Sequence, residues 1–456
     1  MSGLFGTDSA RGLTVAELSC ELAMQAGRAA AELFAGEQGG KIIVAKDGAL
    51  SSAVLEAAVC AGICSSGVDA ETVGELSGAA ASFIVKEHDA AAGIMISEAT
   101  GIPGASGITI FSGDGVRISE EMQFQIEERI YSVTEERRRF ENIGRMLSCN
   151  TAAEEYISHL KKITETPPEK INVAIVCKKG FIGRTAESIL SDMGARVTLL
   201  EGNTKEDSKE AEDSKEVDIT PHNAFEVLMD MVENGIFHCG LAIEGDGSSI
   251  HAVDERGIPV DGDTLLAIIA GYYKEKEVLK DNTIVVNIMS SLGLLNFAEK
   301  KGIRAVTSGS CGRSVLDRMV EGGYNLGGGQ NGHIFMTDYS PCDDGLLCGI
   351  KLLEILKATG KPLSELAGEM KKLPQISLNV RISDKGREVW KNDEKITGLI
   401  EEHEKKLGTD GRIIVRESSG NAPFIRVMIE GTEFGIINDI AMDIAQRIKD
   451  RCRFYN

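Results

Sequence analysis

Residues 41–67 read KIIVAKDGALSSAVLEAAVCAGICSSG and contain the pattern that decides the fold. The first seven residues form a short apolar run, which is typical of a buried strand. Small residues follow, and then an apolar helix runs through Glu56 to Cys64 and ends near Gly67. A strand, a loop, a helix and a glycine in this order predict one unit of an α/β sheet.

The same order of elements recurs twice farther along the chain. Each recurrence begins with an apolar run, continues through a helix that ends at a glycine, and closes with a second strand. The segments are strand 171–177, helix 185–193 with Gly194 and strand 197–200, then strand 283–288, a helix ending at 301 with Gly302 and strand 304–306. Three such units predict three related α/β domains with mixed, mainly parallel sheets.

The composition is that of a globular protein with several domains. The chain has 456 residues, of which 42% are hydrophobic and 26% are charged, so we expect three or four domains. Its net charge of −21 argues against nucleic acids and anionic membrane surfaces as partners. It does not exclude small anionic ligands, because a local pocket can still be positive.

Cysteines and termini indicate a cytoplasmic protein. Among the ten cysteines Cys60 and Cys64 fit one face of an apolar helix, which favours buried reduced thiols over disulfides or zinc. The N-terminus MSGLFGTDSARGL has no apolar signal region, and no run reaches the roughly 18 residues of a membrane helix.

Two stretches are typical of connections. Residues 164–170, TETPPEK, form a rigid, helix-breaking connector before the second strand–helix unit. Residues 203–218 contain the charged tract TKEDSKEAEDSKEVD, which predicts a solvated insertion loop, with a regulatory docking element as the alternative.

Residues 93–111, GIMISEATGIPGASGITIF, place a loop at the end of a buried strand, where α/β proteins usually keep their chemistry. The stretch resembles the active-site loop of the phosphohexomutases, and of the phosphoglucosamine mutases among them, written S-A-S-H-N-P shortly before G-I-K-F-F. Aligned without a gap from Ser97 to Phe111, the resemblance places Ala99 where the family has its phosphorylated serine. Thr100 and Gly101 replace the His-Asn pair.

The resemblance spans the whole chain and implies the family's architecture. Three similar mixed-sheet α/β domains would be followed by a smaller C-terminal α+β domain. The expected boundaries are 1–148, 149–253, 254–370 and 371–456.

The metal loop of the family, D-G-D-G-D-R, corresponds to Glu244-Gly245-Asp246-Gly247-Ser248-Ser249. In the family, three aspartates hold a divalent cation that supplies compensating charge during phosphoryl transfer. Here two carboxylates remain, on Glu244 and Asp246, and the third position is a serine. We therefore expect Mg²⁺ to bind weakly or not at all, with no other cofactor.

The sugar-reading loop G-E-Q-S-G-H corresponds to 328–333, where Gln330, Asn331 and His333 are the candidate contacts to a ligand. The alternative for His333 is a structural role. The phosphate-gripping loop R-x-S-G-T-E-P-x-I-R corresponds to 416–426, RESSGNAPFIR, one residue longer. Its candidate phosphate contacts are Ser418, Ser419, Gly420, Asn421 and Arg426, and a plain hairpin turn is the alternative. Arg11 and Lys46 are retained in two further family motifs, F-G-T-D-G-I-R-G and K-D-T-R-x-S-G.

The resemblance is strong in the core segments and connectors and weak in the active-site loops. This contrast suggests three hypotheses. The first is a phosphohexomutase fold that lacks the phosphoserine mechanism and binds a phosphorylated sugar or a related small molecule. The second is a working phosphosugar mutase, an intramolecular phosphotransferase, with a relocated acceptor at Thr100 or Ser97. The third is a regulatory subunit that pairs with a true mutase or with another enzyme. A protein partner or a homodimer is the assembly expected beside the small-molecule ligand.

Overall fold

The computed structural model describes residues 10–13, 18–35, 40–98, 105–132, 143–178, 180–202, 223–309, 311–383, 386, 390–408, 411–417 and 424–452. The chain divides into two compact units. The first holds the described residues up to 288 together with 303–368, and the second holds 289–302 and the described residues from 369 onward.

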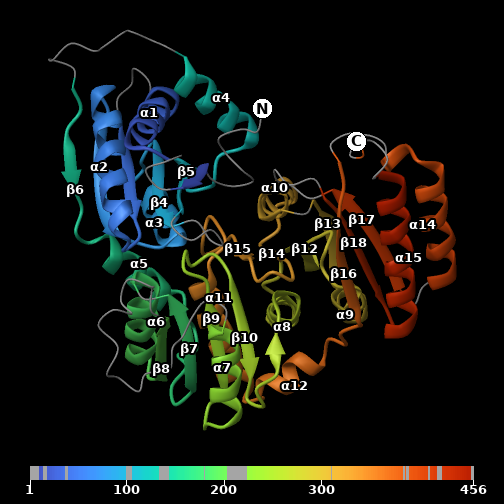
Figure 1. Cartoon of the computed structure of the whole chain (residues 1–456). Helices are drawn as coiled ribbons and strands as arrows, with labels where there is room; N and C mark the ends of the chain where they lie inside the picture. Colours follow the sequence, from blue (N-terminus) through green and yellow to red (C-terminus); the bar gives the residue numbers. More distant parts are fainter. Residues whose placement is uncertain are drawn as a thin grey trace, which may run out of the picture. The chain divides into compact units, whose positions relative to one another are not determined.

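The first sheet has six strands in the order β1-β5-β4-β2-β3-β6 (Figure 1). β2 lies parallel to β3 and β4, and β5 lies antiparallel to β4 and β1. The strands are β1 Ala10–Leu13, β2 Lys41–Lys46, β3 Asp69–Glu75, β4 Ala92–Glu98, β5 Ala105–Ser112 and β6 Met146–Ser148. The helices around it are α1 Cys20–Ala30, extended by a π-helical turn Ala31–Ala35, α2 Leu50–Ser65, α3 Gly78–Glu87 and α4 Glu120–Tyr131.

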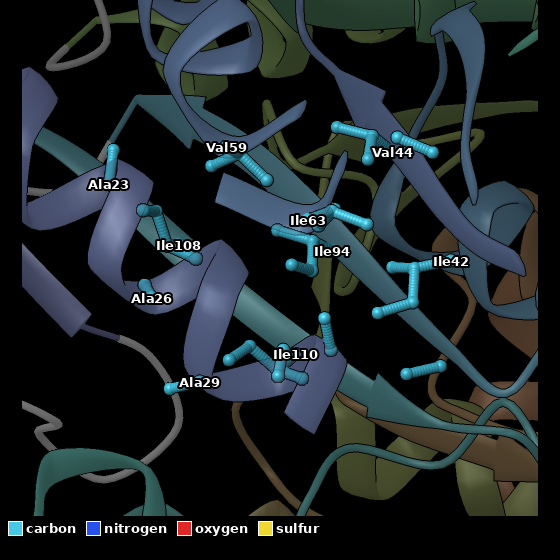
Figure 2. Packing of buried hydrophobic residues seen from close by; sticks show 14 of the residues in the cluster. Ala23, Ala26, Ala29, Ile42, Val44, Val59, Ile63, Ile94, Ile108 and Ile110 are labelled. Atoms are coloured by element: carbon cyan, nitrogen blue, oxygen red, sulfur yellow. The ribbon is translucent and has the colours of Figure 1, made fainter. Parts of the chain in front are cut away.

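Aliphatic side chains of the strands form the core of this sheet. The helices α1 and α2, which are rich in small residues, pack against them. Ile42–Ala45 of β2 are all buried, because helices cover the sheet. Figure 2 shows Ala23, Ala26 and Ala29 of α1 in one cluster with Val59 and Ile63 of α2 and with isoleucines of β4 and β5. Small residues on α1 allow the two helices to come close together.

The approach of α1 to α2 leaves no room for a side chain at two glycines. A Cβ on Gly62 of α2 would lie 2.0 Å from the carbonyl oxygen of Met24, and one on Gly27 of α1 would lie 2.4 Å from the carbonyl oxygen of Val59. Backbone atoms cannot rotate away as a flexible side chain can, so the helices themselves would have to separate.

Gly62→Ala is therefore expected to lower the free energy of unfolding by about 1–3 kcal/mol, because overpacking outweighs the better helix propensity of alanine. Gly398→Ala is the matched control, since Gly398 lies inside a helix with nothing within 4 Å of its added Cβ. That change should raise stability by about 0.5–1 kcal/mol. Urea unfolding of both variants measures the difference, and a Gly62→Ala protein as stable as the parent would contradict the close approach.

The second and third sheets repeat the scheme. The second has the order β11-β10-β9-β7-β8 and the third β13-β12-β14-β15. Their strands are β7 Asn172–Lys178, β8 Arg196–Gly202, β9 Cys239–Ile243, β10 Ile250–Asp254, β11 Pro259–Val260, β12 Thr283–Asn287, β13 Arg304–Ser308, β14 Leu326–Gly328 and β15 Ile334–Met336. The helices of this part are α5 Ala152–Lys162, α6 Phe181–Asp192, α7 Ala224–Glu233, α8 Gly262–Glu275, α10 Gly312–Gly322, α11 Gly345–Thr359 and α12 Leu363–Gly368, with a short 3-10 helix Lys280–Asn282.

The three predicted repeats are confirmed as parallel strand pairs. β2 pairs with β3, β7 with β8 and β12 with β13, each in parallel register. The predicted start of the second helix at Thr185 is wrong, because α6 begins at Phe181. The four residues before Thr185 include Gly183, which the sequence pattern did not assign to a helix. Gly183 is buried in α6, against the side chains of Glu201 and Cys177.

The second unit is a smaller α+β structure. β18 (Phe424–Gly431) lies between β16 (Gln375–Arg381) and β17 (Gly411–Glu417), antiparallel to both. The helices are α9 (Leu292–Lys301), α14 (Glu394–Leu407) and α15 (Phe434–Cys452), with the 3-10 turn Trp390–Asn392. The apolar faces of α14 and α15 cover a core of strand residues such as Val380, Ile425 and Val427.

A buried carboxylate ties α9 to this sheet. Glu430 of β18 is fully buried, and its two oxygens accept hydrogen bonds from the backbone N–H of Leu292 at 3.0 and 2.9 Å. Arg412 of β17 donates from Nε to the same carboxylate at 3.0 Å. The negative charge therefore stabilises the N-terminus of α9 and is neutralised by a guanidinium.

All ten cysteines are free, and Cys60 and Cys64 are buried on α2, as the sequence predicted. Among the described residues, no helix combines the length and the apolar character needed to cross a membrane. The charged tract 203–218 lies outside the described residues.

Candidate active site

The hairpin of β4 and β5 carries the loop that resembles the nucleophile loop. Ser97 pairs with Gly107 and Glu98 pairs with Ser106. Ala99 and Thr100 belong to residues 99–104, which lie outside the described residues. Gly107 also pairs with Arg11 of β1, so the backbone of Arg11 lies in the same row of the sheet as Ser97.

Asp47 fixes the end of β4 beside this loop. Its Oδ2 accepts a hydrogen bond from the backbone N–H of Glu98 at 2.8 Å. Its Oδ1 accepts from the Ser52 hydroxyl at 2.6 Å and from the Ala49 N–H at 3.1 Å. The carboxylate thus joins the start of α2 to the last described residue before the loop. Lys46, the predicted contact, is its half-buried neighbour at the end of β2.

A lysine connects this end of the first sheet to the metal-loop remnant. Lys178, the last residue of β7, forms an ion pair with Glu98. The aliphatic part of Lys178 lies against Gly245, since a Cβ on Gly245 would be 3.2 Å from the Lys178 Cδ. An ammonium-bearing side chain therefore runs past the turn that in the family holds a cation.

The metal-loop remnant is a tight turn between β9 and β10. The Gly247 N–H donates to the Glu244 carbonyl at 2.9 Å, and Gly247 has a φ of 78°, which favours glycine. The Asp246 Oδ1 accepts from both the N–H and the hydroxyl of Ser248, at 2.9 and 2.7 Å. Ser248 is buried and the Glu244 side chain is exposed.

This donor set does not fit a three-carboxylate cation site. One carboxylate faces solvent, the second is engaged by a serine, and the third position offers a neutral hydroxyl. A hard divalent cation depends on several negatively charged oxygens for tight binding. Weak or absent Mg²⁺ binding at this loop stays a prediction, and the donor set is the reason for it.

The sugar-loop remnant lies next to the metal-loop remnant. It is the turn between β14 and β15, closed by a hydrogen bond of 3.0 Å from the Gly332 N–H to the Gly329 carbonyl. The Ile250 N–H donates to the Gly332 carbonyl at 3.1 Å, and Ile250 directly follows the metal-loop turn. Gln330 is half-buried and Asn331 is exposed. The fold thus brings together two loops that the sequence places about 80 residues apart.

His333 is held by a buried carboxylate that the sequence did not reveal. The His333 Nδ1 and the Asp343 Oδ2 lie 2.6 Å apart, and Arg117 donates to the Asp343 Oδ1 at 3.2 Å. The side chain of Asp343 is 3% exposed, whereas those of His333 and Arg117 are 25% and 23% exposed. A buried carboxylate thus orients two cationic groups that remain partly open to solvent.

The electrostatics of this cluster favour its charged form. Burial by itself lowers the pKa of His333, but the hydrogen bond and charge of Asp343 outweigh burial and raise that pKa above its ordinary value. The charge of Asp246 contributes to the rise and that of Arg117 opposes it. Burial alone would raise the pKa of Asp343, but Arg117 and His333 hold it below its usual value.

The adjacent Asp344 has the opposite behaviour. It is buried at the N-terminus of α11, where its Oδ1 accepts the Leu347 N–H at 2.9 Å and its Oδ2 accepts the Tyr156 hydroxyl at 2.7 Å. Burial raises the pKa of Asp344 to about 6. Within the described part of the chain, no cationic side chain donates a hydrogen bond to Asp344. The pKa values of two neighbouring carboxyl groups therefore move in opposite directions, because only one has a guanidinium and an imidazole beside it.

In the second unit, two arginines flank the predicted phosphate loop. Ser418, Ser419, Gly420 and Asn421 lie outside the described residues. Arg416 of β17 and Arg426 of β18 are directly opposite each other where the hairpin enters this loop. Burial, and then the charge of Arg426, lower the pKa of Arg416. Like charges opposite each other destabilise a strand pair, and a bound anion would relieve that repulsion.

Of the predicted site residues, the structure brings Asp246 and the 328–333 turn together and leaves Glu244 exposed. It adds Asp47, Arg117 and Asp343, which sequence analysis missed. Asp47 directly follows a buried strand, and that position was a usable signal. No sequence pattern indicated a role for Asp343. Its role follows from its burial and from its contacts with Arg117 and His333, which are known only from the fold.

The fold consists of three α/β sheets and a small α+β unit, and the candidate loops lie at strand ends. This architecture defines a protein of the phosphosugar-mutase class. Models of the phosphoglucomutase/phosphomannomutase family match residues 2–137 (α/β/α domain I), 261–373 (α/β/α domain III) and 378–447 (C-terminal domain). The chain is 35% identical over 461 residues to a phosphoglucosamine mutase of Clostridium novyi, covering 99% of each protein. The chain therefore belongs to the phosphohexomutase superfamily.

Solved structures share the fold. A phosphoglucomutase/phosphomannomutase family protein from Burkholderia thailandensis superposes with a TM-score of 0.81 at 20% identity, over 98% of this chain and 96% of that one. An S-to-A variant of Aspergillus fumigatus N-acetylphosphoglucosamine mutase, in complex with glucose 1,6-bisphosphate, superposes with a TM-score of 0.58 at 11% identity, over 98% and 95% of the two chains.

Asp343→Asn is expected to lower the pKa of His333, since burial and Arg117 then act without the opposing carboxylate. Below the unfolded pKa of about 6.5 the parent has the full stabilisation from charged His333, and it loses this as pH rises through the higher folded pKa. The variant should therefore lose more stability at pH 6 than at pH 9, by roughly 3 kcal/mol at the lower pH.

NMR titration of the seven histidine imidazoles measures this shift, with His333→Gln assigning the signal. A His333 resonance that titrates at the same pH in the parent and in Asp343→Asn would contradict the assigned pair.

Ser248→Asp is expected to restore a cation requirement. A third carboxylate beside Asp246 would lower stability by roughly 1–3 kcal/mol in the absence of divalent cations, and Mg²⁺ should recover most of that loss. Thermal unfolding with and without Mg²⁺ measures the effect, and Ser248→Ala is the control that removes the hydroxyl without adding charge. If the parent itself is stabilised by Mg²⁺ as strongly as Ser248→Asp, then the remnant is still a cation site.

Proposed function

We propose that the chain binds a phosphorylated sugar and lacks the phosphoserine mechanism of its family. The residue that carries this proposal is Ala99, which the ungapped resemblance to the family loop S-A-S-H-N-P places at the phosphorylated serine. A methyl group cannot carry a phosphoryl group, so the covalent step has no acceptor there.

The surroundings of this position support the loss. The lysine of the G-I-K-F-F stretch corresponds to Thr109 of β5. The metal-loop remnant uses Asp246 to hold Ser248, and Lys178 runs beside it. Phosphoryl transfer rests on positioning and on neutralising charge on the moving group. Two contributors to that neutralisation, the lysine and the metal loop, thus differ from the family motifs.

Retained groups support binding of a sugar phosphate. Asp343 raises the pKa of His333, whose side chain is partly open to solvent, and Arg416 and Arg426 flank the loop that resembles the family's phosphate grip. The S-to-A neighbour from Aspergillus fumigatus is a complex with glucose 1,6-bisphosphate. Replacement of a serine by alanine is therefore compatible with bisphosphate binding on this fold. Because the relatives include phosphoglucosamine mutases, glucosamine phosphates are the first ligands to try.

The alternative is an active phosphosugar mutase with Ser97 or Thr100 as acceptor. Identity of 35% over nearly the full length of a phosphoglucosamine mutase favours it. Ser97 is the last residue but one of β4 and precedes the vacant nucleophile position by two residues.

Intact-mass spectrometry after incubation with glucose 1,6-bisphosphate and Mg²⁺ decides between the two. We expect an unchanged mass, because no acceptor hydroxyl stands at position 99. A gain of one phosphoryl group that disappears in Thr100→Val or in Ser97→Ala would overturn the proposal and establish the relocated acceptor.

Binding is measured separately by the shift in melting temperature with glucosamine 6-phosphate, glucosamine 1-phosphate and glucose 1,6-bisphosphate at millimolar concentration. Arg426→Gln should abolish or strongly reduce the shift. Arg129→Gln is the matched control, since Arg129 is an exposed arginine of α4 paired with Glu32. No shift with any sugar phosphate would refute ligand binding and leave a scaffold role.

A further inference from the structure

A histidine, a cysteine and a glutamate converge away from the candidate active site. They are His88 at the end of α3, Cys149 directly after β6, and Glu155 in the first turn of α5. One potential ligand atom from each lies within 4.8 Å of the others, and all three residues are half-buried. Three separate elements of the first unit thus direct metal-binding atom types to one point.

The cluster is held by hydrogen bonds that orient each group. The His88 Nε2 lies 2.8 Å from the Glu155 Oε2. Thr151 donates its hydroxyl to the Glu155 Oε1 at 2.6 Å, and its oxygen lies 3.4 Å from the Cys149 Sγ. The Cys149 N–H donates to the Thr72 carbonyl at 2.9 Å, which fixes the cysteine backbone to β3. The ligand-bearing positions are therefore set by the backbone and by neighbouring side chains.

The remaining nitrogen of His88 faces a carboxylate. The Glu71 Oε2 lies 3.4 Å from the His88 Nδ1, and the Lys41 Nζ lies 2.6 Å from that oxygen and 3.5 Å from the same ring nitrogen. Histidines that bind metals almost always donate their second N–H to a carboxylate, a carbonyl or water, which fixes the ring and the tautomer. Glu71 occupies that position, and the metal-facing nitrogen is then Nε2.

We propose that His88, Cys149 and Glu155 form a binding site for Zn²⁺ or a similar borderline cation. Imidazole nitrogen, thiolate sulfur and carboxylate oxygen are the ligand types of zinc, and three protein ligands leave a fourth position for water. The charges also balance: a thiolate and a carboxylate neutralise the dication, while Glu71 and Lys41 neutralise each other. Thiolate selects this cation over Mg²⁺ or Ca²⁺.

Closing the site needs only local movement. Zinc bonds of about 2.0–2.3 Å in a tetrahedral arrangement place ligand atoms roughly 3.5 Å apart. The three ligand atoms lie within 4.8 Å of one another, so each pair needs to move by only about an ångström to reach that spacing. The cation replaces the proton between His88 and Glu155 and the thiol proton, so binding weakens as pH falls. A bound cation would join the ends of α3, β6 and α5, which are distant in sequence.

The first test uses the unmodified protein. Zn²⁺ affinity is measured by competition with a chromogenic chelator, and the alkylation rate of each cysteine by iodoacetamide is followed by peptide mass spectrometry with and without ZnCl₂. We expect one Zn²⁺ per chain and slower alkylation of Cys149 but not of the half-buried Cys20. Equal alkylation of Cys149 with and without Zn²⁺ would overturn the proposal without any mutation.

Variants then localise the binding. Cys149→Ser and Glu155→Gln should each weaken Zn²⁺ binding by about 100-fold or more, and Glu71→Gln by about 10- to 100-fold. Cys20→Ser and Glu154→Gln are matched controls, the latter an exposed carboxylate in the same turn of α5 as Glu155. If Zn²⁺ binds equally well to the Cys149, Glu155 and control variants, the ion is adventitious or bound elsewhere and the proposal fails.

Discussion

Asp343 is a buried carboxylate that Arg117 and His333 reach from two different elements of the first unit. Burying a charge is costly unless it is paired and hydrogen-bonded, so the position of Asp343 constrains both partners. Arg117 follows β5 of the first sheet, and His333 precedes β15 of the third. Pairing the carboxylate thus fixes the end of one sheet against a turn of another. The charged state of His333 follows from the same interaction.

The loops around this cluster carry residues that differ from the family motifs they resemble. Strand pairing, helix caps and apolar cores need residue types of a general kind, so they tolerate wide variation within the family. Catalysis needs particular chemical groups. Aligned with the family motifs, Ala99 takes the place of the nucleophile, Thr109 that of a lysine and Ser248 that of a carboxylate. The Asp246–Ser248 hydrogen bonds show how the altered metal loop is stabilised locally without a third carboxylate.

Much of the fold was predictable from local pattern. Apolar runs such as Ile42–Ala45 predicted buried strands, and Gly302 predicted the end of α9, where it adopts a φ of 64°. The start of α6 was not predicted, because Gly183 is tolerated there by burial against β7 and β8. At the site, His333 and Asp246 were found through their motifs. Asp343, Arg117 and Asp47 were missed, since their roles depend on partners distant in sequence.

By itself, the sequence determined the three strand–helix–strand units, the reduced cysteines and the identity of the residues in each altered loop. The strand–helix–strand units follow from the spacing of apolar residues and from glycines at helix ends. The loop residues follow directly from comparison with the family motifs. Only the tertiary structure decided in which direction the pKa of each carboxyl group moves and which groups it contacts. Asp343 and Asp344 are neighbours of the same type, yet the first pairs with a guanidinium and an imidazole and the second with a tyrosine hydroxyl. Their pKa values move in opposite directions because burial and charge are properties of the folded surroundings. The same reason explains why the convergence of His88, Cys149 and Glu155 could not be read from their spacing.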